Sequence, residues 1–229
     1  VVLIVGYMGD RVVEFVRGRY PGLREDTVEQ TERLGLGHAV SLAAPFAADR
    51  PLLIVLGDTL FEADLKSVLE GKVSTIGVKA VDDPRRFGIV ELNADGSIAR
   101  MVEKPEHPAS NLAITGVYYF TSGGPLFGAL RELQARGVRT RGEFQLTDAM
   151  QLLLERGETI RTFPVLGWFD CGKTETLLET NRVLLERQKS SAPIAGSVFH
   201  EPLLVAVGAV VEGCILGPHV SIAAGARLK

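Results

Sequence analysis

An acidic and a basic side chain stand next to each other near the middle of the chain, at the end of the segment FGIVELNADGSIARMVEKP (87–105). The carboxylate of Glu103 can accept hydrogen bonds from hydroxyl groups, and the ammonium of Lys104 can neutralise a phosphate as a point charge. The plain alternative is a surface Glu-Lys step, because strict alternation along a strand sends neighbouring side chains to opposite faces. A site shared by these two residues therefore requires a bend in the backbone.

The two apolar-rich runs of this segment flank the sequence NADG, which predicts a β-hairpin with a four-residue turn. That turn would place Leu92 opposite Ser97 and Gly88 opposite Met101, so that Gly88 lies close to Glu103. A glycine lets a ligand approach the backbone closely. The end of the hairpin therefore resembles one half of a binding pocket.

Two aspartates follow strand-like runs in distant parts of the chain, Asp58 after LLIVLG and Asp170 within GWFDCG. In open α/β sheets, ligands bind where the strands end, so both side chains could reach the same edge. Two carboxylates there could hold a magnesium ion, Mg2+, and leave positions for phosphate oxygens. Each aspartate taken alone is as readily a helix cap or a turn residue. Together with Lys104, they predict a site for a metal ion and phosphates.

Strand-like and helix-like segments alternate along the first 189 residues. This order predicts an α/β fold with a doubly wound, mostly parallel, Rossmann-like sheet and an antiparallel insertion at the hairpin. The predicted strands are 1–5, 52–58, 74–81, 111–120 and 159–165, and the predicted helices are 10–20, 37–48, 63–71, 125–136, 143–156 and 174–189.

The pattern changes after KSSAP, which is a plausible linker, and the last segment, 190–229, forms a second predicted domain. Aliphatic residues recur there at every sixth position, with a small or modest residue two places before each. This period is typical of a parallel β-helix, whose coils stack their inward aliphatic residues in columns. The predicted inward residues are Val198, Leu204, Val210, Leu216, Ile222 and Leu228.

The composition excludes several classes of protein. With 229 residues, 46% of them apolar, the chain can bury a sizeable core. A net charge of -3 gives no general basic field, so we expect no nucleic-acid partner. The two cysteines, Cys171 and Cys214, have no metal-ligand spacing and predict free thiols in a reducing compartment. We expect no membrane span and a cytoplasmic location. Because the chain opens on VVLIVGYMGD and stops in mid-pattern at SIAAGARLK, we expect truncation at both ends.

Seven segments together resemble the sugar-1-phosphate nucleotidylyltransferases, most closely the long-form glucose-1-phosphate thymidylyltransferases, in family order and at similar spacing. They are VEQTERLGLGHAV, LIVLGD, FGIVEL, VEKP, SNLAITGVYYF, RGEFQLTDAM and GWFDCGK. The resemblance runs from residue 1 to about 185, and the 190–229 segment extends it as the start of a left-handed β-helix.

The resemblance implies roles for ten residues of this chain. Gln30 and Gly35 would contact the nucleobase, Asp58 and Asp170 would hold magnesium, and Lys104 would grip the sugar phosphate. The residues implied at the sugar are Phe87, Gly88, Glu103, Ile114 and Trp168. The resemblance also implies a family strand and Gly-rich loop, GxGTRL, that are missing here. We therefore expect exposed sheet edges on both sides of the resulting gap, and no activity from the chain as given.

The implied reaction is attack of a sugar-1-phosphate oxygen on the α-phosphorus of a nucleoside triphosphate, with release of pyrophosphate and without a protein nucleophile. Glucose-1-phosphate and dTTP are the favoured substrates. Three alternatives remain: a guanylyl- or uridylyltransferase for another sugar phosphate, an acyltransferase in the tail using His200 or His219, and a non-catalytic sugar-nucleotide-binding regulatory subunit. Because stacked β-helices often associate side by side, we expect a homo-oligomer.

Overall fold

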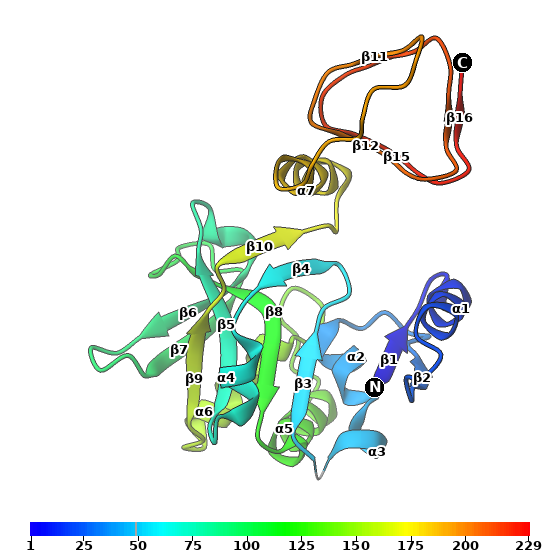
Figure 1. Ribbon diagram of the computed structural model, residues 1–229. Coiled ribbons are helices and arrows are strands. Elements are labelled where there is room, and N and C mark those ends of the chain that lie inside the picture. The colour runs from blue at the N-terminus through cyan, green and yellow to red at the C-terminus, as the bar shows by residue number, and fades with distance from the viewer. Residues whose placement is uncertain (49) are drawn as a thin grey trace. The chain divides into compact units, whose positions relative to one another are not determined.

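The structure, a computed structural model, describes residues 1–48 and 50–229 and divides the chain into two compact units (Figure 1). The first unit consists of Val1–Leu56 and Glu62–Leu166. The second consists of Gly57–Phe61 and Gly167–Lys229. None of the helices in the described residues has both the length and the apolar character that a bilayer span requires.

A six-stranded sheet forms the centre of the first unit. Its strands are β7 (Ile98–Glu103), β6 (Gly88–Leu92), β8 (Leu112–Phe120), β5 (Ser74–Ala80) and β9 (Ile160–Pro164), in that order, with β3 (Leu52–Val55) also paired to β8. Only β5 and β9 pair in parallel, so the expectation of a mostly parallel sheet is wrong. The reason is the almost wholly buried strand β8, which runs antiparallel to both of its neighbours β3 and β5. The antiparallel insertion at the hairpin is present as β6 and β7.

The hairpin register differs from the predicted one by two residues. Gly88 lies opposite Glu103, and Leu92 lies opposite Ile98. The register shifts between Glu91 and Leu92, where the β7 strand carries one extra residue, and the loop is closed by the Asn93 N–H donating to the Ser97 carbonyl oxygen at 2.8 Å. An irregularity of this kind leaves no mark in the apolar pattern. The shift places the glycine directly beside the carboxylate.

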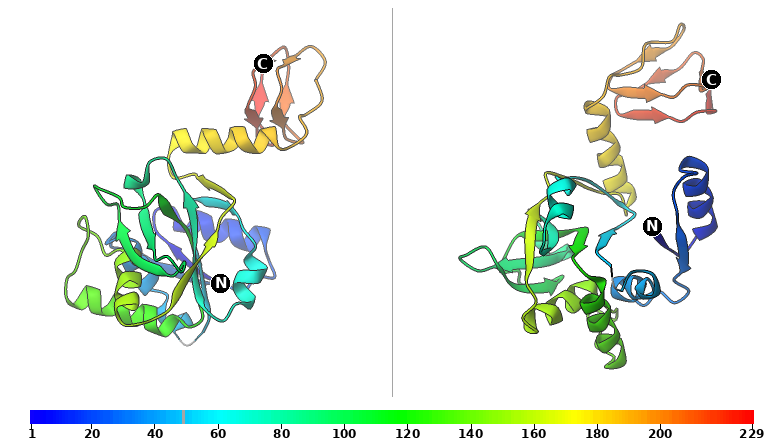
Figure 2. Two further views of the ribbon diagram at one scale, coloured as in Figure 1. Left: turned by 90° about the vertical axis from the view of Figure 1, so that its left-hand side faces the viewer. Right: turned by 60° about the horizontal axis from the view of Figure 1, so that its bottom comes forward.

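Helices cover both faces of this sheet, as the doubly wound prediction requires. Figure 2 shows α4 (Leu65–Glu70) on one face and the pair α5 (Gly123–Ala135) and α6 (Leu146–Glu155) on the other. Side chains such as Leu126 and Met150 are fully buried against the sheet. The helix predicted for 37–48 is two short helices, α2 (Leu36–Ser41) and α3 (Ala44–Ala47), with Pro45 in the first turn of the second.

A separate parallel pair lies in the same unit. Strand β1 (Val2–Val5), helix α1 (Gly9–Arg19) and strand β2 (Asp26–Glu29) form a β-α-β unit whose side chains Val2 and Ile4 pack against the main core. Among the described strands, β1 pairs only with β2, and β3 pairs only with β8. Each therefore has one edge without a strand partner, as the sequence predicted.

The second unit begins with a strand pair that the sequence did not predict, β4 (Thr59–Glu62) with β10 (Gly167–Asp170). Helix α7 (Thr174–Glu186) follows and ends before the predicted position. Asn181 ties this helix to the last segment, because its Nδ2 donates to the carbonyl oxygen of His219 at 2.9 Å and its Oδ1 accepts from the Ser221 hydroxyl at 2.6 Å.

Six short strands follow and pair in parallel, two by two. They are β11 (Val198–Phe199), β12 (Leu203–Val205), β13 (Val210–Val211), β14 (Ile215–Leu216), β15 (Val220–Ile222) and β16 (Arg227–Leu228). The pairs join Val198 to Ile215, Leu203 to Val220 and Val210 to Arg227, so the chain returns after 17 residues rather than 18.

This shorter return corrects half of the predicted inward column. Leu216, Ile222 and Leu228 do belong to the apolar cluster of this segment, but Val198 and Leu204 are exposed, and Val210 lies outside the cluster. Their places are taken by the next residue in each case, Phe199, Val205 and Val211. The period of six holds within each half, and one missing residue between Val211 and Leu216 shifts the phase.

Candidate functional site

The end of the β6–β7 hairpin forms a small polar pocket built by four elements. A Cβ atom added to Gly88 would lie 2.8 Å from the Thr147 hydroxyl oxygen, 3.0 Å from Glu103 Oε2 and 3.1 Å from Ile114 Cδ1. These distances are shorter than a side chain tolerates, so only glycine fits at this position without displacing its neighbours. The structure thus brings together three of the predicted sugar residues, Gly88, Glu103 and Ile114, around one point.

Glu103 is fixed in place by a residue that sequence reasoning missed. The hydroxyl of Thr147, in the first turn of α6, donates to Glu103 Oε2 at 2.7 Å. The side chain of Glu103 is only 10% exposed, and Thr147 is buried. A hydrogen bond to an ionised, largely buried group compensates part of its lost hydration. One carboxylate oxygen is therefore held, and Oε1 is left for Lys104 and for a ligand.

Lys104 supplies the bend that a shared site requires. Its backbone is left-handed, with φ of 43°, and its N–H donates to the Phe87 carbonyl oxygen at 3.0 Å. This conformation breaks the alternation of the strand, so that Lys104 Nζ lies 3.5 Å from Glu103 Oε1. The Lys104 side chain is 42% exposed, which leaves its ammonium accessible to an anion.

Arg141 holds this bend from outside. Its Nη2 donates to the Lys104 carbonyl oxygen at 2.8 Å, and its own backbone is left-handed, with φ of 53°. The residue belongs to the RGEFQLTDAM segment, but no local pattern links it to Lys104. Arg141 is the second residue near the pocket that the sequence did not indicate.

Two ionisable groups near the pocket have shifted pKa values. Burial raises the pKa of Tyr118, and the nearby carboxylate of Glu103 raises it further. Burial also raises the pKa of Asp148, next to Thr147, and a hydrogen bond from Thr140 opposes this only in part. Both shifts show that the floor of this region is poorly hydrated.

Asp58 and Asp170 converge in the second unit. Asp58 precedes β4, Asp170 ends β10, and the Cys171 N–H donates to the Asp58 carbonyl oxygen at 2.8 Å. A Cβ atom added to Gly172 would lie 3.1 Å from Asp170 Oδ1 and 3.1 Å from Asp58 Oδ2. The two carboxylates therefore surround one point, which the absence of a side chain at Gly172 keeps open.

The donor chemistry of this pair suits magnesium. The described residues contain no group of three or more His, Cys, Asp or Glu side chains able to hold a metal ion, so any ion here would have two carboxylates. Magnesium is usually bound in this way, by one or two carboxylates with substrate phosphates completing the shell. Trp168, another predicted sugar residue, lies two positions before Asp170 on β10 and thus on the same side of that strand.

The predicted nucleobase residues form a further group in the first unit. Gln30 follows β2, and its Nε2 donates to the Gly35 carbonyl oxygen at 3.1 Å. Gly35 has φ of 108°, and a Cβ there would lie 2.7 Å from both the Glu143 Cβ and the Phe144 carbonyl oxygen. Gly35 is thus packed too closely for any other residue, and its carbonyl group is rigidly placed.

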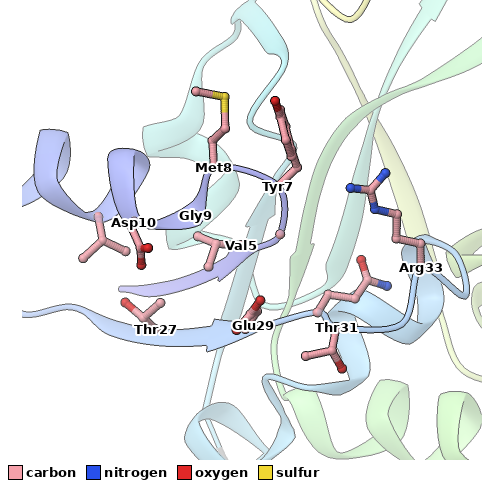
Figure 3. Close-up of a pocket in the computed structure, with 12 residues that line it drawn as sticks. Val5, Tyr7, Met8, Gly9, Asp10, Thr27, Glu29, Thr31 and Arg33 are labelled. Atoms are coloured by element: carbon pink, nitrogen blue, oxygen red, sulfur yellow. The ribbon is translucent and has the colours of Figure 1, made fainter.

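Gln30 also lines a cavity of about 480 Å³ at the carboxyl ends of β1 and β2 (Figure 3). The cavity mixes carboxylate, hydroxyl, guanidinium and aromatic groups. In Figure 3, Tyr7 and Arg33 extend to the same side of it. Its lining residues include Tyr7, Asp10, Thr27, Glu29, Gln30 and Arg33.

Comparison with known families is decisive at this point: the family model described as Nucleotidyl transferase matches residues 13–187. The chain belongs to this nucleotidyl transferase family. The match spans the elements that carry all three groups of candidate residues, from α1 to α7.

Individual relatives agree with this assignment. The chain is 33% identical over 192 residues to the low-salt glycan biosynthesis nucleotidyltransferase Agl11 of Haloferax volcanii, covering 80% of this chain and 52% of the relative. It is 33% identical over 241 residues to a glucose-1-phosphate thymidylyltransferase of Streptomyces antibioticus, covering 99% of this chain and 65% of the relative. The chain thus spans only about half to two thirds of the length of these relatives.

A solved structure shares the fold. A crystal structure described as a putative glucose-1-phosphate thymidylyltransferase from Bacillus anthracis in complex with a sucrose superposes with a TM-score of 0.69 at 28% identity. The match covers 84% of this chain and 78% of that structure. A UDP-glucose pyrophosphorylase complexed with UDP-glucose has a TM-score of 0.66 at 22% identity, covers 82% of this chain and 81% of that one, and supports the fold alone.

Proposed function

We propose that this chain is part of an enzyme that joins a sugar-1-phosphate to a nucleoside triphosphate, giving a nucleoside diphosphate sugar and pyrophosphate. The observation that carries this proposal is the convergence of Asp58 and Asp170 around the open position at Gly172. A fold that only bound sugar nucleotides would have no need of two facing carboxylates, whose mutual repulsion costs stability unless a cation lies between them.

The residues of this chain would act by positioning and by charge neutralisation. Glu103, fixed by Thr147, would accept hydrogen bonds from sugar hydroxyl groups at the pocket closed by Gly88. Lys104 would hold the phosphate of the sugar, so that one of its oxygens attacks the α-phosphorus in line as pyrophosphate leaves. A protein nucleophile is not needed, because the attacking oxygen belongs to the substrate.

Asp58 and Asp170 would hold the magnesium ion, which neutralises charge on the reacting phosphates when bound. The role of the two aspartates is to fix its place with carboxylate oxygens on a short strand pair. Trp168 and Phe87 would complete the sugar side, as the family resemblance implies.

Glucose-1-phosphate and dTTP are the substrates that we propose first. The thymidylyltransferase of Streptomyces antibioticus supports them, because its match extends over 99% of this chain. A uridylyltransferase is the second candidate, since the UTP–glucose-1-phosphate uridylyltransferase AglF of Haloferax volcanii is 32% identical over 193 residues.

The last segment, 190–229, is proposed as the start of a left-handed parallel β-helix and as the second domain. The parallel pairs at a constant shift of 17 residues support a coiled arrangement of the chain. We also propose a homo-oligomer, because coils that present aliphatic residues such as Val198 and Ile215 outward favour association.

The test is an assay of pyrophosphate release by the full-length protein with each common sugar-1-phosphate and each nucleoside triphosphate. We expect release with glucose-1-phosphate and dTTP, and none without a divalent cation. Tight binding of a sugar nucleotide without release of pyrophosphate from any substrate pair would instead identify a non-catalytic binding subunit.

A further inference from the structure

Gln30 is held by two hydrogen-bond acceptors on the same side of its amide. Its Nε2 lies 3.1 Å from the Gly35 carbonyl oxygen and 3.1 Å from His38 Nδ1. A carbonyl oxygen can only accept, so the amide nitrogen of Gln30, and not its oxygen, must face Gly35. The second amide hydrogen then points to His38, and Nδ1 of that ring has to be the acceptor. His38 is therefore neutral in this arrangement, with its proton on Nε2.

The opposite end of the amide is free to read a ligand. In the part of the chain that the structure describes, no group donates a hydrogen bond to Gln30 Oε1. Gln30 lines the 480 Å³ cavity, whereas Gly35 and His38 do not. The carbonyl of Gln30 is thus an acceptor that no protein group uses, beside a cavity that also contains the donor groups of Arg33 (Figure 3).

An acceptor beside a donor recognises one type of base edge. Thymine, uracil and guanine carry a ring N–H next to a carbonyl oxygen, so the N–H can donate to Gln30 and the carbonyl can accept from Arg33. Cytosine and adenine carry an unprotonated ring nitrogen at the same place, which would face the Gln30 oxygen with two acceptors together. A polar site rejects such an edge strongly, because buried polar groups are left unpaired.

We propose that His38 is a positioning residue that selects the nucleobase by fixing the orientation of the Gln30 amide, and that the site accepts bases with a ring N–H beside a carbonyl group. The inference rests on the proposed function, since it concerns the nucleotide of that reaction. His38 does not line the cavity and acts only through Gln30. Without its acceptor, one of the two groups that hold the amide is lost, and the rotated amide would present its NH2 group to cytosine.

The test compares three forms of the full-length protein: the unchanged protein, His38→Leu and His38→Asn. Asparagine retains an acceptor close to the position of Nδ1, and leucine does not. The measurement is kcat/KM for dTTP, UTP and CTP with one sugar-1-phosphate. We expect His38→Leu to lower the ratio of dTTP to CTP by about ten- to a hundredfold, mainly through KM for dTTP, and His38→Asn to restore most of it. His200→Leu, at an exposed histidine outside the cavity, is the matched control and should leave the ratio unchanged.

An unchanged ratio in His38→Leu would overturn the proposal, and so would an equal loss in the leucine and asparagine variants. A second measurement needs no activity: in protein with 15N-labelled histidine, the His38 Nδ1 signal should have the chemical shift of an unprotonated ring nitrogen. A proton on Nδ1 at neutral pH would also overturn the proposal. If no triphosphate releases pyrophosphate from the unchanged protein, the proposed function fails, while the state of the His38 ring is still decided by the nitrogen spectrum.

Discussion

Arg141 and Lys104 are joined through the backbone: the guanidinium of Arg141 donates to the carbonyl oxygen of Lys104 at 2.8 Å, and both residues are left-handed. A left-handed conformation is unfavourable for a residue with a side chain, so it persists only where its surroundings hold it. The contact explains how one strand end can present a carboxylate and an ammonium to the same pocket.

The variant Arg141→Met should therefore impair the use of the sugar phosphate. Because the Lys104 carbonyl loses its donor, we expect the bend to relax and KM for the sugar-1-phosphate to rise by roughly tenfold, the effect of about one charge-assisted hydrogen bond. Steady-state kinetics at saturating triphosphate measure this. An unchanged KM would mean that the bend at Lys104 is maintained without Arg141.

Thr147→Val removes the hydroxyl that holds Glu103 and keeps the size of the side chain. A carboxylate that is only 10% exposed then loses its donor, so we expect a loss of about 1.5–3 kcal/mol in unfolding free energy and a higher KM for the sugar phosphate. Chemical denaturation and kinetics give the two values. Thr147→Ser retains the hydroxyl and is the control; a serine variant as impaired as the valine variant would argue for packing rather than hydrogen bonding.

Gly88→Ala should close the sugar pocket. The new methyl group would lie within 3.0 Å of the Thr147 hydroxyl and Glu103 Oε2, so both side chains must move. We expect a large loss of sugar-1-phosphate binding, visible by calorimetry. Gly128→Ala is the matched control, because a methyl group there meets nothing within 4 Å and lies in the interior of α5, where alanine is preferred by about 1 kcal/mol. Normal binding by Gly88→Ala would place the sugar elsewhere.

Asp148 should make stability depend on pH. Its pKa is raised by burial in the folded protein, although its place in the first turn of α6 favours the charge. The folded state therefore prefers the protonated form, and stability is present in full below the unfolded pKa and is lost as the pH rises through the raised folded pKa. Asp148→Asn should remove this loss and raise stability at neutral pH by less than about 1 kcal/mol, because solvent screens a half-buried charge. Thermal melting of both proteins between acidic and neutral pH measures this; an equal pH dependence in both would contradict it.

The sequence predicted the positions of most elements and the residues of each candidate group, because apolar periodicity and glycine placement are local signals. It missed what depends on distant pairing. The parallel sheet was predicted from alternation along the chain, but β8 returns from the hairpin and separates β3 from β5. Asp58 and Asp170 were expected together at the edge of that sheet, and the strand pair β4–β10 is what joins them.

Small irregularities had a similar effect. One extra residue in β7 moved Glu103 opposite Gly88, and one missing residue after Val211 moved the first half of the inward column by one position. Neither changes the apolar pattern enough to be seen. Thr147 and Arg141 were missed because each contacts its partner across about forty residues of chain, a separation at which no spacing rule operates.

The claim that Asp58 and Asp170 together hold a catalytic metal ion is tested most directly by pyrophosphate release from Asp170→Asn in the full-length protein at saturating magnesium. The control is Asp64→Asn, since Asp64 only caps α4 through Ser67 and asparagine retains that role. We predict that Asp170→Asn keeps its fold and its melting temperature but loses activity by about a thousandfold or more, while Asp64→Asn remains active. Near-normal turnover by Asp170→Asn in magnesium would contradict the account.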